Sequence, residues 1–157
     1  MKRLAVSMAL TFIVALMVSP LSVTAQGTTR VTGGGATVIT TLVLSDGSTM
    51  AAQPPLPTHL GFGVVRQPDG RVSGQFQCLI NGPGFTGHFM NLHGDVTQLE
   101  VTGNTARFSG ESNFGPYSVV VTDGPHPTLS LRWTAPFGPG VVGTEEVLTH
   151  GSVHIAE

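Results

Sequence analysis

The chain has 157 residues, enough for one domain with a sizeable core. Charged residues make up only 10% of it, less than half of the ~25% usual for a soluble domain, so long helices covered with ion pairs are not expected. The formal net charge of −2 argues against nucleic-acid binding, which needs clustered lysine and arginine.

The N-terminal residues 1–25 have the layout of a cleavable export signal. Lys2 and Arg3 give a positive start, the run Leu4–Val18 is apolar, and Val23–Ala25 ends in the small residues that a signal peptidase reads. The apolar run is shorter than the ~20 residues that span a bilayer, which favours cleavage over the alternative of a retained anchor. We therefore predict a signal peptide over 1–25 and a secreted mature chain, periplasmic or extracellular, over 26–157.

The predicted mature chain is mildly acidic and contains a single cysteine. Five arginines and no lysine stand against nine acidic residues, and the resulting net charge of −4 suits neither a membrane surface nor nucleic acid. Cys78 has no disulfide partner within the chain and shares strand parity with Phe76 and Ile80. We predict a buried thiol that packs as a small apolar side chain; an intermolecular bridge or a reactive thiol is the alternative.

Beyond Gln26 the sequence predicts an all-β fold of eight to ten strands. Short alternating apolar runs are separated by turn residues about every ten positions, and no helical periodicity interrupts them. The expected strands are Val31 with Ala36–Leu44, His59–Val65, Val72–Ile80, Phe85–Leu92, Val96–Thr102, Thr105–Glu111, Tyr117–Val121, Leu129–Trp133 and Glu145–Ile155.

The clearest hairpin turns at Gly103–Asn104. A two-residue turn there places Leu99 opposite Phe108 and Val101 opposite Ala106, so apolar side chains meet on one face. Glu100 and Arg107 then meet on the other face. A slip of one residue would destroy both matches, so the register is strongly specified.

An antiparallel meander of this length closes into a barrel or folds into a two-sheet β-sandwich. We predict a small closed barrel with the first and last strands adjacent, because closure removes edges that a lysine-free chain cannot protect with charge. The single domain over 26–157 is expected to carry one long loop, a proline-rich segment at 45–58 with Pro54, Pro55 and Pro57. That loop is interpreted as a surface excursion, with a lid over the barrel mouth as the alternative.

Several segments resemble a known family, the post-COAP domains of exported bacterial proteins. They are Arg30–Gly35, His59–Val65, the hairpin Val96–Gly110, Tyr117–Asp123 and Gly151–Ile155. The proline-rich segment and the stretch 137–143 depart from the family pattern. The resemblance implies a β-rich extracellular module, and it implies no catalytic residues.

Two segments match the dinucleotide-binding pattern G-x-G-x-x-G, at Gly82–Gly87 and Gly138–Gly143. The pattern binds a pyrophosphate only where a helix N-terminus follows it. Strand-like sequence follows both segments here, so we interpret them as hairpin loops and predict no cofactor.

Six histidines stand out against the low charge, but none has the His-x-His spacing that would bring two onto one ion from a strand. His150 and His154 share a face about 13 Å apart, too far for one zinc. A metal site could form only if His88, His93 and Asp95 met His150 or His154 across strands. We therefore predict no metal site.

The sequence predicts no catalytic residues, because it contains neither a Gly-x-Ser-x-Gly nor a His-Glu-x-x-His motif. Among possible carboxylate pairs, Glu100 already faces Arg107 rather than Glu111. Glu145 and Glu146 are consecutive, so they point to opposite faces of a strand.

Binding or structural interaction is the function left by these exclusions. We predict an exported, non-catalytic extracellular β module whose partner is an extracellular or cell-envelope component. A barrel filled by its own side chains would act through its loops or outer face, whereas a wider barrel would carry an apolar small molecule inside. The aromatic residues are interpreted as core: Phe62, Phe76, Phe85, Phe89, Phe108, Tyr117 and Trp133.

Overall fold

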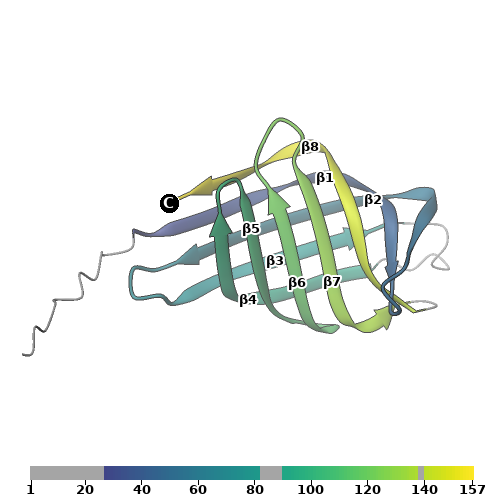
Figure 1. The fold of residues 1–157 in the computed structure, drawn as a ribbon, viewed down its shortest axis with the longest axis horizontal. Helices are drawn as coiled ribbons and strands as arrows, with labels where there is room; N and C mark the ends of the chain where they lie inside the picture. Colours follow the sequence, from purple (N-terminus) through teal and green to yellow (C-terminus); the bar gives the residue numbers. More distant parts are fainter. Residues whose placement is uncertain (1–26, 82–89, 138–139) are drawn as a thin grey trace, which may run out of the picture.

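The computed structural model describes residues 27–81, 90–137 and 140–157. Within them, eight antiparallel strands form a closed barrel in which each strand pairs with its sequence neighbours and the last pairs with the first (Figure 1). The strands are β1 (Thr29–Leu44), β2 (Thr49–Arg66), β3 (Val72–Ile80), β4 (Met90–Thr102), β5 (Thr105–Ser112), β6 (Gly115–Thr122), β7 (Thr128–Phe137) and β8 (Val141–Ala156). The barrel predicted from the sequence is confirmed, and the sandwich is excluded.

The barrel closes along a seam between β1 and β8, which pair from Arg30 with Ala156 to Leu44 with Val141. Glycines allow the two backbones to approach. A Cβ at Gly35 would collide with the carbonyl oxygen of His150, and a Cβ at Gly151 would collide with that of Gly34. Gly151 also has a φ of 125°, a conformation that a side chain disfavours. Closure therefore depends on glycine at this seam.

Inward-facing side chains from all eight strands fill the interior. Phe62 and Phe76 both contact Phe108, with ring centroids 5.3 and 6.0 Å apart, and Phe76 stacks on Tyr117 at 5.5 Å. Trp133 is also buried, so five of the predicted core aromatics are confirmed, while Phe85 and Phe89 lie outside the described residues. Aliphatic side chains pack around them: Val31, Ile39, Leu60, Val64, Leu92, Val96, Val119, Val121, Leu129, Leu131, Leu148 and Val153.

The predicted hairpin at Gly103–Asn104 is confirmed in its register. Leu99 pairs with Phe108, Glu100 with Arg107 and Val101 with Ala106. The chain leading into it differs from expectation, because β4 runs unbroken through residues 93–95, where a break between two strands was expected. A register shift between Val96 and Gln98 interrupts its pairing with β5 without ending the strand.

The proline-rich loop predicted at 45–58 is wrong. Only residues 45–48 form a turn, and the prolines belong to β2, whose first half pairs with β1 through Ala51 and Leu56. Among the described residues the register with β3 begins at Thr58, and the Asn81 amide donates to the Pro57 carbonyl at 3.0 Å, a bond that needs no proline N–H. Pro54 and Pro55 also lie where the β1–β2 register shifts. A lid at this segment is therefore excluded.

No helix in the described part of the chain is long and apolar enough to cross a membrane. The signal peptide predicted for 1–25 lies outside the described residues.

We expect Gly151→Ala to lower the unfolding free energy by at least about 2 kcal/mol, because the new methyl group meets the backbone of β1 at a strained φ. Gly63→Ala is the matched control, since a Cβ there meets open space. The control should be neutral or stabilising by about 0.5 kcal/mol. Equal stability of the two variants in urea unfolding would contradict a tight seam.

Candidate functional site

The interior contains one carboxyl group, that of Glu146, among the residues that the structure describes as buried. Its side chain is 2% exposed and accepts two hydrogen bonds from threonine hydroxyls. Thr37 Oγ1 donates to Oε2 at 2.5 Å, and Thr144 Oγ1 donates to Oε1 at 2.9 Å. Both threonines are themselves buried, so the three side chains form a small polar cluster inside an otherwise apolar barrel.

Burial raises the pKa of the Glu146 carboxyl above its ordinary value of 4.5, and the two threonine hydroxyls offset part of the rise. The thiol of Cys78 lies in the same interior and is fully buried, as predicted. Its pKa is raised well above the ordinary value, chiefly by burial and further by the charge of Glu146. Cys78 is therefore a protonated thiol at neutral pH, which makes it a poor nucleophile.

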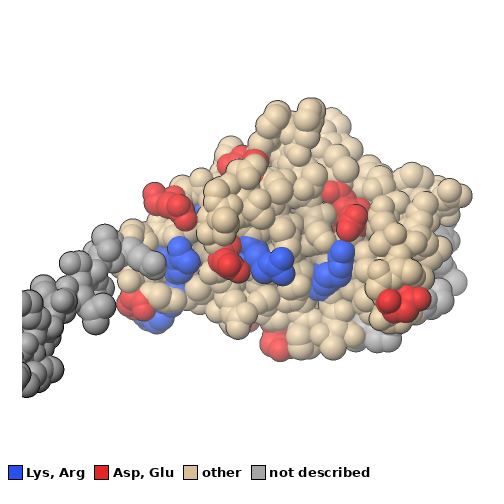
Figure 2. Space-filling view, viewed as in Figure 1, with Lys and Arg blue, Asp and Glu red and all other residues tan. Residues whose placement is uncertain are grey.

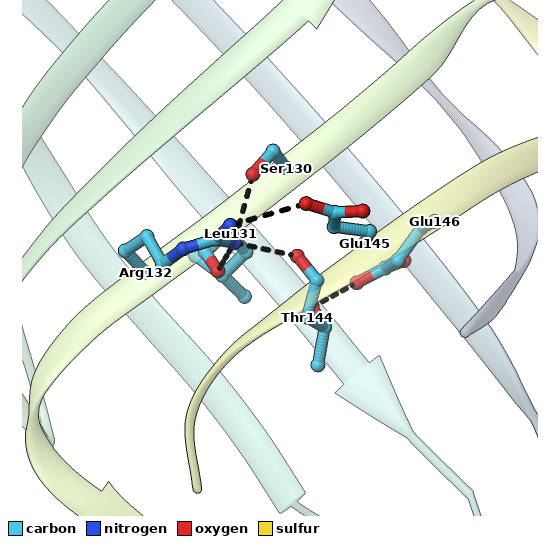
Figure 3. A network of polar contacts seen from close by, with 6 residues as sticks. All are labelled: Ser130, Leu131, Arg132, Thr144, Glu145 and Glu146. Atoms are coloured by element: carbon cyan, nitrogen blue, oxygen red, sulfur yellow. Dashed lines mark hydrogen bonds and ion pairs between the residues drawn. The ribbon is translucent and has the colours of Figure 1, made fainter. Parts of the chain in front are cut away.

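Glu145, the neighbour of Glu146, faces outward and is hydrogen-bonded to Arg132, while Thr144 links Arg132 to Glu146 (Figure 3). Arg132 of β7 donates to Glu145 Oε1 at 3.2 Å and to the Thr144 carbonyl at 3.0 Å, which fastens β7 to β8. A Cβ at Gly143 would collide with the side chain of Arg132. The opposite orientation of the two glutamates, predicted from strand parity, is confirmed.

The buried carboxyl should make the stability of the protein depend on pH. Because its folded pKa is raised, the native state holds this proton more tightly than the unfolded state, and stability falls as pH rises from the unfolded value of 4.5 through the folded one. Glu146→Gln removes this effect, so its stability relative to the wild-type protein should be greater at pH 8 than at pH 4.

Urea unfolding at the two pH values measures that difference. Glu145→Gln is the control, since it makes the same substitution at the neighbouring position, on the exposed face of β8. A Glu146→Gln difference that is the same at both pH values would contradict a proton held inside the barrel.

The structure does not bring the remaining candidate residues from the sequence together. His93 and Asp95 lie on the outer face of β4, while His150 and His154 lie on the outer face of β8, which is separated from β4 by three strands in either direction round the barrel. No group of three or more metal-ligating side chains occurs within the described ranges. His88 lies outside them. Glu111 pairs with Asp95 rather than with Glu100.

The glycine motif at 138–143 lies at the β7–β8 connection, where β8 begins directly at Val141. The interpretation as a hairpin loop is confirmed for this segment as far as it is described. The other motif, Gly82–Gly87, lies outside the described residues.

A groove of about 590 Å³ crosses the outer faces of β2, β3, β4 and β5. Polar side chains form its walls, because on β3 and β4 they alternate with the apolar side chains that fill the interior. These wall residues are Gln75, Gln77, His93, Asp95, Glu111 and Asn113. Gly61 and Gly63 of β2 also line it. Its volume is within the range of about 300–1,000 Å³ typical of ligand sites.

Asn113, in the β5–β6 turn, fixes one end of the groove against β4. The backbone amide of His93 donates to Asn113 Oδ1 at 2.9 Å, and Asn113 Nδ2 donates to the Asn91 carbonyl at 2.8 Å. The Asn113 amide also donates to the His93 carbonyl at 3.1 Å. Three bonds thus hold a turn residue in place, so this end of the groove is preformed.

The groove has an acidic character. Asp95 and Glu111 lie directly opposite each other on β4 and β5, and neither lysine nor arginine lines the groove. On the face that Figure 2 shows, acidic and basic residues are interspersed on a mostly uncharged surface. A pair of like charges facing across two strands is unfavourable on its own. This arrangement suits a ligand that donates hydrogen bonds.

Sequence reasoning missed this groove, although one signal was present. Gly61 and Gly63 share strand parity within a predicted strand, and glycine inside a strand marks a bulge or the close approach of another group. Nothing in the sequence indicates that the amide side chains of Gln75 and Gln77 line a groove. Their grouping with Asp95 and Glu111 depends on the register of four strands.

Neither a protein-family model, nor a curated protein, nor a solved structure matches this chain.

Proposed function

We propose that this protein is an exported, non-catalytic module that binds an extracellular or cell-envelope partner through its outer wall. The observation that carries the proposal is the division of the barrel into a filled interior and a preformed polar groove outside. An eight-stranded barrel is either filled by its own side chains or holds one small ligand, and buried side chains fill this one. The binding surface is then the wall, and the groove across β2–β5 is its most developed part.

The leader-like sequence at 1–25 supports export, and the resemblance to post-COAP domains agrees with a β-rich extracellular module. The polar groups that line the groove serve recognition better than catalysis.

The competing function is a carrier that holds an apolar small molecule inside the barrel. The interior positions of all eight strands are occupied by buried side chains, including three packed phenylalanines at its centre. A ligand there would have to displace several of them, each at a cost of about 1–3 kcal/mol in lost packing. The wall is therefore favoured over the interior.

Native mass spectrometry of the protein recovered from its export compartment tests this proposal. We expect the mass of the bare mature chain, or a bound ligand that is absent from Gly63→Val, in which a side chain fills the outer groove. A stoichiometric ligand that persists in Gly63→Val and leaves only on denaturation would establish the carrier and contradict the proposal.

A further inference from the structure

Two glycines of β2 have no role in the fold that the structure reveals. Every other glycine in the described strands has either a positive φ or a neighbour closer than 3.0 Å to its would-be Cβ. Gly61 and Gly63 have neither: nothing lies within 4 Å of a Cβ at either position, and their φ values are ordinary. Because glycine weakens a strand, its presence here marks a place where another molecule approaches the backbone closely.

The register shows what surrounds this bare stretch of backbone. Gly63 pairs with Gln75, which pairs with Asp95, which pairs with Glu111. Gly61 pairs with Gln77, which pairs with His93. On the other side, Gly61 pairs with Gly34 of β1. The outer face therefore lacks side chains at these two positions of β2 and carries polar side chains on the neighbouring strands β3–β5.

The depression continues beyond the groove. A second hollow of about 310 Å³ shares Gly61 and Gln77 with the first, and His59 and Leu79 line it as well. Leu79 is partly exposed there and offers an apolar contact. Two adjoining hollows over one floor suit an elongated ligand made of several units.

We propose that this groove binds a neutral oligosaccharide chain, lying along the Gly61–Gly63 floor. The proposal rests on the function proposed above. Sugar hydroxyls donate hydrogen bonds to the carboxylates of Asp95 and Glu111, and they both donate to and accept from the amides of Gln75 and Gln77. The absence of lysine and arginine from the lining disfavours phosphate and acidic polysaccharides.

A basic peptide is the other ligand that an acidic groove could attract. Its cationic side chains would pair with Asp95 and Glu111, and its backbone carbonyls would accept from the amides of Gln75 and Gln77. A polyol uses donors and acceptors together. The lining carries the uncharged amides of Gln75, Gln77 and Asn113 beside its two carboxylates, which favours an uncharged polyol over a chain of repeated positive charges.

The test measures binding of the mature protein to an array that carries neutral oligosaccharides, acidic oligosaccharides and an oligolysine peptide. Two variants change the groove: Gly63→Val raises its floor, and Gln75→Ala removes an amide from its wall. Their matched controls are Ser73→Val, on the outer face of β3 beyond the groove, and Gln67→Ala, in the β2–β3 turn. Circular dichroism and thermal unfolding check that each variant folds.

We expect binding to one class of neutral oligosaccharide that weakens about tenfold or more in Gly63→Val and Gln75→Ala and is unchanged in both controls. No binding to any neutral oligosaccharide, or binding that survives both groove variants, would overturn the inference. Oligolysine binding lost in the same variants would also overturn it while leaving the proposed outer-wall function intact. A ligand retained in Gly63→Val and released only on denaturation would instead defeat the proposed function itself.

Discussion

The backbone hydrogen bonds between β1 and β8 join the ends of the meander and leave the sheet without a free edge. Glycine is required there, because Gly35 and Gly151 bring the two backbones closer than a Cβ would permit. The seam also separates inside from outside. Without it Glu146, on β8, would lose its hydrogen bond to Thr37 of β1 and its place in the apolar core.

Strand parity assigns polar groups to two environments with different consequences. Inside, Glu146 is surrounded by apolar packing and satisfied by Thr37 and Thr144, which ties the stability of the barrel to protonation. Outside, Gln75 and Asp95 lie among solvent-exposed neighbours and are available to a partner. The interior thus contributes stability and leaves little room for a ligand. A partner would therefore bind at the outer face of the barrel.

Local patterns predicted much of the fold from the sequence. The register of the Gly103–Asn104 hairpin follows from matching Leu99 with Phe108, and Cys78 is buried because its parity is that of Phe76. The proline-rich segment was misread, because Pro54 is accommodated where the β1–β2 register shifts, which depends on the pairing of the two strands. The groove depends on the register of four strands, so it could not be predicted from any single segment of the sequence.

Hydrogen exchange measured by NMR tests closure of the barrel most directly. Successive amides of β1 alternate between partners on β2 and β8, so a closed barrel protects amides of both kinds along 30–44. We expect them to exchange as slowly as the amides of β6, which has a partner on each side. If the β1 amides that face β8 exchanged as fast as those in the turns while those that face β2 stayed protected, the sheet would be open. The division between filled interior and binding wall would then fail.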